Sequence, residues 1–132
     1  MGTRTETMVQ PLLPGLRLPL VTGIDGDGPV VAESACEVIG FRDPKRRYLH
    51  AEVLIHQQAD HQWIWAICYG AEESGGGYLP GPKWGKFAAC REDALVFALD
   101  ELTGRVRRGA RATPFARKII AWAQAKRDEV SA

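Results

Sequence analysis

Residues 48–69, YLHAEVLIHQQADHQWIWAICY, decide the fold. Apolar and polar side chains alternate over Tyr48–His56, and this period of two predicts a strand with one buried face. The residues of Gln62–Tyr69 are apolar on both faces, which predicts a second strand in the centre of a sheet. The polar segment Gln57–Asp60 lies between them and predicts the turn of an antiparallel hairpin.

The segments on either side of this hairpin extend the predicted sheet. Upstream, Val30–Phe41 predicts another strand, with its clearest pattern in Ala35–Phe41. Arg42–Arg47 then predicts a turn with a basic tip, so the three strands form an antiparallel meander. Downstream, Gly70–Gly85 contains the triplets GGG and PGP and predicts a long loop of the kind that is often functional.

Two helices are predicted after this loop. An apolar stripe runs through Arg91–Val106, and Thr113 followed by Pro114 is typical of the N-cap and first position of a second helix. Gly104 and Gly109 bracket a basic segment that we interpret as a hinge. The fold class is therefore α+β, a three-stranded or four-stranded antiparallel meander sheet backed by two C-terminal helices. The expected core comprises Trp65, Ile67, Leu95, Leu99, Ile119 and Trp122.

Length and composition indicate one globular domain, since the chain has 132 residues of which 45% are hydrophobic. We expect an extended Pro/Gly-rich N-terminal arm over residues 1–29 and a single α+β domain over residues 30–132. No apolar run approaches the roughly 20 residues that cross a bilayer, so no membrane partner is expected. Three scattered cysteines and the lack of a signal-peptide pattern predict a cytoplasmic location.

The net charge of +1 hides a strong asymmetry along the chain. Residues 1–102 contain nine Lys or Arg and fourteen Asp or Glu, whereas residues 103–132 contain eight and two. Such an excess predicts a polyanion-binding surface, although it is also compatible with solvated helix faces or with a homodimer that pairs acidic and basic parts. The predicted nucleic-acid-binding residues are Arg105, Arg107, Arg108, Arg111, Arg117 and Lys118.

Aromatic and basic side chains also occur together in the long glycine–proline loop. These residues, Tyr78, Lys83, Trp84 and Lys86, suit contact with a protein partner or stacking on a nucleotide. Trp84 has a second interpretation, in which it folds back onto the core and anchors the loop. The glycines match neither phosphate-binding pattern, G-x-x-x-x-G-K-[ST] or G-x-G-x-x-G.

The histidines and cysteines are the candidates for catalysis or metal binding. His50, Glu52 and His56 share one face of a predicted strand, but His50 and His56 lie about 20 Å apart in an extended chain, too far for one metal. Cys68, in the apolar central strand, is predicted to act as a small hydrophobe, and Cys90 occupies a position where Ser or Thr would cap a helix. We therefore expect no catalytic residue, no metal site and no cofactor.

The order of strands and helices resembles the double-stranded-RNA-binding fold, in which three antiparallel strands precede a helix. It lacks that family's helix before the sheet and the lysine-rich start of the helix after it. Residues 75–95 are similar to small accessory proteins of plasmids and phages. The leading hypothesis is a small non-catalytic binding module that contacts nucleic acid through its C-terminal basic surface. The alternatives are a protein-binding inhibitor or adaptor that uses the loop and the N-terminal arm, and an enzyme that uses Cys90 or the histidines.

Overall fold

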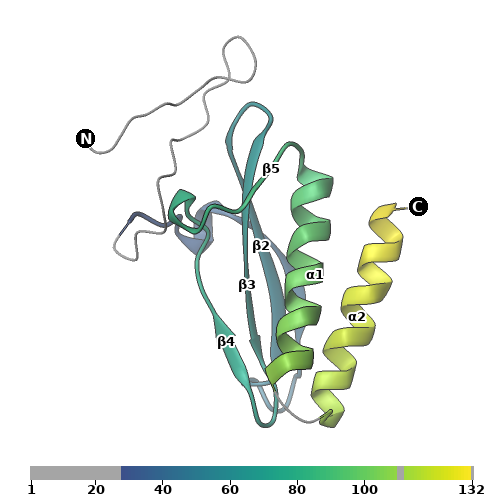
Figure 1. Ribbon diagram of the computed structural model, residues 1–132. Coiled ribbons are helices and arrows are strands. Elements are labelled where there is room, and N and C mark those ends of the chain that lie inside the picture. Colours follow the sequence, from purple (N-terminus) through teal and green to yellow (C-terminus); the bar gives the residue numbers. More distant parts are fainter. Residues whose placement is uncertain (1–27, 110–111, 132) are drawn as a thin grey trace.

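The computed structural model describes residues 28–109 and 112–131, which form an antiparallel sheet with two helices on one of its faces (Figure 1). The predicted N-terminal arm lies outside the described residues except for Gly28 and Pro29, and so does Arg111. The strands are β1 (Glu37–Arg42), β2 (His50–Ala59), β3 (Gln62–Gly70), β4 (Gly75–Gly77) and β5 (Phe87–Ala88). The helices are α1 (Arg91–Gly109) and α2 (Pro114–Ser131), with short 3-10 turns η1 (Glu33–Ala35) and η2 (Pro82–Trp84).

The sheet confirms the predicted α+β meander and adds strands to it. Strands β1 to β4 follow one another in the order of the sequence, and β5 pairs with the other end of β3. The segment Gly70–Gly85 is therefore not the uninterrupted loop that we predicted, because Gly75–Gly77 pairs with residues 68–70. Three glycines show no alternating pattern, yet their backbone groups form ladder hydrogen bonds like those of any other residue.

A bulge in β2 sets the register of the central hairpin. Ala59 pairs with Gln62, whereas Gln57 pairs with Trp63, so Gln58 is an extra residue on its strand. Strand β2 thus extends beyond the predicted end at His56. Relative to the pair of Ala59 with Gln62, every pair on the other side of the bulge is shifted by one residue. A shift of one residue changes which side chains of the two strands share a face of the sheet.

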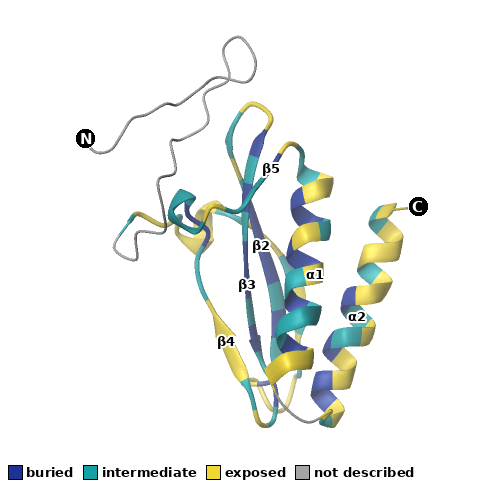
Figure 2. Ribbon diagram, in the orientation of Figure 1, coloured by how far each residue is buried: buried dark blue, intermediate teal, exposed yellow. Residues whose placement is uncertain are grey.

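The core lies between the sheet and the two helices (Figure 2). Four residues of the predicted core are confirmed as buried in one cluster: Ile67, Leu95, Leu99 and Ile119. The other two, Trp65 and Trp122, are only partly buried and pack against its margin. Trp65 lies 5.3 Å from the ring of Phe97, and Trp122 lies 5.3 Å from the ring of Phe41. Tryptophan is large, so it is often highly but not fully buried.

Helix α1 extends to Gly109, beyond the predicted end at Val106, so the segment between Gly104 and Gly109 is helical and not the hinge that we predicted. Its apolar stripe continues from Leu102 to Val106, both of them buried, through Gly104. A glycine in a helix interior costs about 1 kcal/mol relative to alanine, which the burial of these side chains outweighs. The connection to α2 is therefore confined to residues 110–113. Within the described ranges, no helix is both long and apolar enough to cross a membrane.

The helix starts use side chains as acceptors for free amides. Cys90 is at the predicted cap position of α1, where its thiol accepts a hydrogen bond from the amide of Asp93 at 3.5 Å. Thr113 directly precedes α2, as predicted, but the carboxylate of Glu72 accepts the amide of Phe115 at 3.0 Å. The cap of α2 thus comes in part from the β3–β4 turn, which ties this turn to the helix.

Candidate functional site

Two turns of the sheet meet at one end of the molecule, together with the junction between the helices. The β1–β2 turn, the β3–β4 turn, the end of α1 and the start of α2 lie together at this end (Figure 1). The ring of Phe41, beside the first turn, lies 5.4 Å from the ring of Phe115 in α2. The hydrogen bond from Phe115 to Glu72 joins the second turn to the same helix. Residues that are distant in sequence therefore form one continuous surface.

This surface, which we call the basic end, gathers cations from two segments. Four of the residues predicted to bind nucleic acid belong to it, and the β1–β2 turn adds three more. Arg107, Arg108 and Lys118 are exposed and form no ion pair with any described residue. Arg117 is also exposed and donates a hydrogen bond to the carbonyl of Ala112. The basic end comprises Lys45, Arg46, Arg47, Arg107, Arg108, Arg117 and Lys118.

The carboxylates near the basic end are fewer, and one of them, Asp43, pairs with Arg46 at 3.7 Å. Among the described residues of the two turns they are Asp43, Glu72 and Glu73. Asp43 accepts the amides of Arg46 and Lys45 at 2.8 Å each, and these bonds hold the pKa of Asp43 below its ordinary value. The carboxylate of Glu72 accepts the amide of Phe115 at the start of α2. The seven cations outnumber these acids, so the surface carries a positive excess.

The remaining predicted nucleic-acid-binding residues do not join the basic end. Arg105 lies one helical turn before Gly109 and pairs with Glu101 at 3.5 Å. Arg111 lies outside the described residues. Further along α2, Arg127 pairs with Asp100 at 2.7 Å, and Lys126 pairs with Glu129 at 3.3 Å. Ion pairs with acids therefore account for part of the C-terminal excess of positive charge.

Two of the loop residues, Tyr78 and Lys86, converge on Glu101 of α1. Tyr78 donates its hydroxyl hydrogen to the carboxylate at 2.8 Å, and the ammonium of Lys86 lies 2.8 Å from it. The indole of Trp65 adds a third donor at 3.1 Å. Burial alone would raise the pKa of Glu101, but the hydrogen bonds from Lys86 and Tyr78 outweigh it and hold that pKa below its ordinary value. Burial and the bond to Glu101 raise the pKa of Tyr78, so the phenol remains protonated.

Trp84 and Lys83 extend this cluster outward. The ring of Trp84 packs edge-on against Tyr78 at 5.3 Å, and its indole donates to the carbonyl of Leu79 at 2.9 Å. Lys83 lies 4.8 Å from the ring of Trp84. These contacts agree with the interpretation of Trp84 as an anchor of the loop. A role of the four residues in binding a partner stays a prediction.

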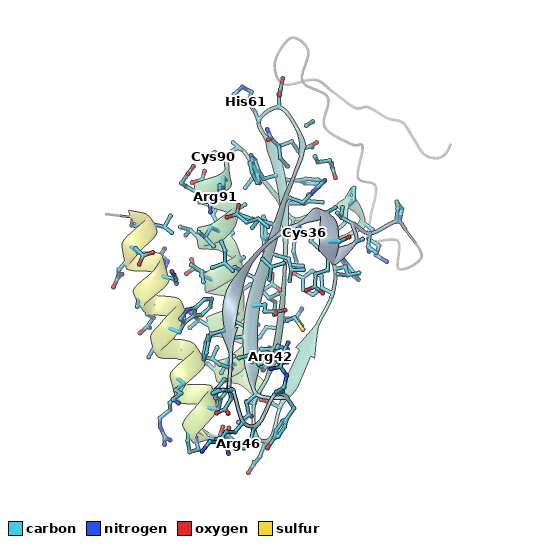
Figure 3. The ribbon with its side chains drawn as sticks, turned by 180° about the vertical axis from the view of Figure 1, so that it is seen from behind. Cys36, Arg42, Arg46, His61, Cys90 and Arg91 are labelled. Carbon is cyan, nitrogen blue, oxygen red and sulfur yellow. The ribbon has the colours of Figure 1, made fainter. Side chains whose placement is uncertain are left out.

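A second polar cluster lies on the outer face of the sheet, away from the helices, and includes Arg42, which is labelled in the rear view of Figure 3. Nε2 of His50 lies 3.4 Å from Sγ of Cys68, and Nδ1 of the same ring lies 3.0 Å from the carbonyl oxygen of Tyr48. Glu52 is directly opposite Cys68 in the register and pairs with Arg42 at 3.8 Å. Cys68 is partly exposed on this face, so our assignment of it as a core residue overlooked the face it occupies.

The register explains why sequence reasoning missed this pair. His50 was placed on the polar face of its strand, but the face of Cys68 depends on the bulge at Gln58. His56 lies on the same face as His50 and instead contacts the carbonyl of Ala35 at 3.1 Å. The two histidines thus have separate partners. The described part of the chain contains no group of three His, Cys, Asp or Glu residues suited to hold a metal ion.

Comparison with known proteins supplies no relative from which a role could be transferred. The chain matches no protein-family model, no curated protein and no solved structure.

Proposed function

We propose that this protein binds nucleic acid through the basic end, by contacts to phosphate groups. The observation that carries the proposal is the meeting of two cationic segments, Lys45–Arg47 and the residues around the α1–α2 junction, at one end of the fold. Clustered Arg and Lys side chains attract a polyanion and release its counterions, which is the main source of sequence-independent affinity for nucleic acids.

The helix dipoles help to separate this function from a purely structural role. Arg107 and Arg108 are in the last turn of α1, where a cation stabilises a helix by about 0.3–1 kcal/mol. Arg117 and Lys118 are near the start of α2, whose first turn contains no acidic residue. Cations are unfavourable at this end of a helix, so stabilisation of α2 does not explain them. Binding of an anionic ligand accounts for both pairs.

The chemistry of the side chains favours backbone contacts over base recognition. Arginine presents a planar fork of donors that matches a phosphate, and lysine acts as a point charge. The cations lie at the ends of elements and in a turn, and not along the length of one helix. We therefore expect similar affinity for different sequences and a strong dependence on salt.

The experiment compares two variants that each remove two positive charges. Arg108→Gln with Lys118→Gln changes the basic end, and Lys126→Gln with Arg127→Gln changes the opposite end of α2 as the control. Binding to fluorescent single-stranded DNA, double-stranded DNA and double-stranded RNA is measured by anisotropy over a range of salt concentrations. The first variant should weaken binding and reduce the slope of log Kobs against log salt by about two units, one for each lost contact.

The control variant should retain the slope of the unmodified protein. Thermal unfolding of both variants checks that the fold persists, since exposed charges contribute little to stability. Equal effects of the two variants would contradict the assignment to the basic end. Binding to heparin or to an acidic protein, without binding to any of the oligonucleotides, would contradict the nucleic-acid proposal and favour a different polyanion.

A further inference from the structure

We propose that Cys68 is a nucleophilic thiol that reacts with small acyl donors, with His50 as its general base, on the outer face of the sheet. The pair comes from two neighbouring strands, β2 and β3, and its atoms are within hydrogen-bonding distance, with Nε2 of His50 3.4 Å from Sγ of Cys68. A nucleophile in contact with a base that is itself oriented by a third group is the general arrangement of an activated nucleophile.

The third group here is the backbone carbonyl of Tyr48, which determines the tautomer of the imidazole. A carbonyl oxygen only accepts hydrogen bonds, so Nδ1 of His50, 3.0 Å away, must carry the ring proton. The neutral ring then has its lone pair on Nε2, which faces the thiol of Cys68. His50 is therefore oriented as a proton acceptor for this cysteine.

The charges around the pair indicate general-base catalysis and not a preformed thiolate. Burial, followed by the carboxylates of Glu52 and Glu33, raises the pKa of the Cys68 thiol, and Arg42 opposes them only in part. These groups come from β2, η1 and β1, so they surround the thiol on the outer face. At neutral pH the sulfur keeps its proton until it attacks, and a base must accept that proton during the reaction.

A glycine on the neighbouring strand lies opposite each member of the pair. Gly77 pairs with Cys68 and Gly70 pairs with His50 across the strands. A Cβ atom on Gly77 would lie 2.8 Å from Sγ of Cys68, so any larger residue would displace the thiol. The three residues of β4 are all exposed (Figure 2). A small ligand can therefore approach the sulfur over this strand.

The proposed step transfers an acyl group from an ester to the thiol. A bond forms between Sγ and the acyl carbon as the thiol proton moves to Nε2 of His50. The bond between the acyl carbon and the leaving oxygen then breaks, and the imidazolium gives its proton to that oxygen, or to water when the leaving group departs as a phenolate. The products are S-acyl Cys68 and an alcohol or phenol, with no oxidation or reduction.

The test uses p-nitrophenyl acetate with the full chain, and the three cysteines serve as internal comparisons. Cys36 and Cys90 are as partly buried as Cys68, but their thiols contact the carbonyl of Ala32 and the amide of Asp93. Peptide mass spectrometry should find Cys68 acetylated at least about tenfold faster than the other two near neutral pH. His50→Gln should reduce the rate at Cys68 by at least about tenfold, and the control His56→Gln should leave it unchanged.

The pH profile of the unmodified chain tests the proposal even if His50→Gln does not fold. With a general base beside the thiol, the rate at Cys68 levels off at a pH below the raised pKa of the thiol. Without a base, the rate keeps rising to the higher pKa of the thiol. Equal acetylation of the three cysteines, or a rate that follows only the thiol, would overturn the proposal.

Discussion

Over residues 50–53, at the start of strand β2, the two faces of the strand have opposite character, although Leu54, farther along the outer face, is buried as well. One face presents Ala51 and Val53, fully buried beneath the helices. The other presents His50 and Glu52, partly exposed and in contact with polar groups of neighbouring strands. Because the helices stabilise the sheet from one side, the polar part of the other side is free to hold reactive groups.

The energetic scale of the two faces differs accordingly. Burial of a large aliphatic side chain contributes about 1.5–3 kcal/mol, whereas an exposed ion pair contributes about 0–1 kcal/mol. Substitutions toward the helices should therefore affect unfolding, and those on the polar outer surface should mainly affect chemistry. Both statements can be tested with matched variants.

The largest effect is expected from a truncation beneath the helices. Leu99→Ala removes a side chain with 0% exposure and should lower the free energy of unfolding by about 2–5 kcal/mol. Val38→Ala, on the outer face where Val38 pairs with Leu54 and is 39% exposed, should cost less than about 1.5 kcal/mol. Urea unfolding of both proteins measures the contrast. Similar losses would show that the two faces do not differ as described.

An intermediate effect is expected at the polar cluster on the helix side. Glu101→Gln should lower the free energy of unfolding by about 1–3 kcal/mol near neutral pH. Lys86 and Tyr78 lose the carboxylate that accepts their hydrogen bonds in a partly buried site. Glu52→Gln, on the outer face, should cost less than about 1 kcal/mol, since its partner Arg42 is 3.8 Å away and exposed to solvent.

Acid should reduce the difference in the free energy of unfolding between the unmodified chain and Glu101→Gln. The pKa of Glu101 is lower in the folded than in the unfolded chain, so its charge adds stability above the unfolded value of about 4.3. That contribution is lost as the pH falls through the folded pKa, and the variant never has it. Urea midpoints measured from neutral pH downward give the gap, and a gap that is constant or widens in acid contradicts this assignment.

The smallest effect is expected at strand β4, where two neighbouring glycines have different surroundings. Gly77→Ala should cost about 1 kcal/mol, because the new Cβ would lie 2.9 Å from Cα of Cys68 and the strands must separate slightly. Gly76→Ala meets nothing within 4 Å and should change stability by less than about 0.5 kcal/mol. Thermal unfolding of the two single variants compares them, and an equal response would indicate that β4 adjusts freely.

Much of the fold could be predicted from side-chain patterns. Contact with the core produces the alternation in β2, the apolar run of β3 and the stripe of α1. The sequence alone therefore predicts these three elements. Strand β4 could not be predicted, because glycines give no pattern. Helix α1 extends to Gly109, beyond the predicted end at Val106, and these last residues are exposed, so the apolar stripe gives no signal for them.

The candidate sites were harder to predict from the sequence than the fold. The cations of the C-terminal helices could be counted, but their meeting with Lys45–Arg47 depends on how the turns pack. The contact between Tyr78 and Glu101 likewise joins residues whose separation in sequence carries no signal. Cys68 and His50 meet only because of the register. In each case the missing information is tertiary and not chemical.

The bulge at Gln58 also has a consequence for how this chain could change in length. Gln58 is surplus to the pairing of Gln57 with Trp63 and of Ala59 with Gln62, so a deletion at this point would leave every remaining pair intact. A deletion in the regular part of β2 would instead move the side chains of all residues on one side of the deletion to the opposite face of the sheet. The tip of this hairpin is therefore where a residue can be lost in evolution or by design without exchanging the core for the polar surface.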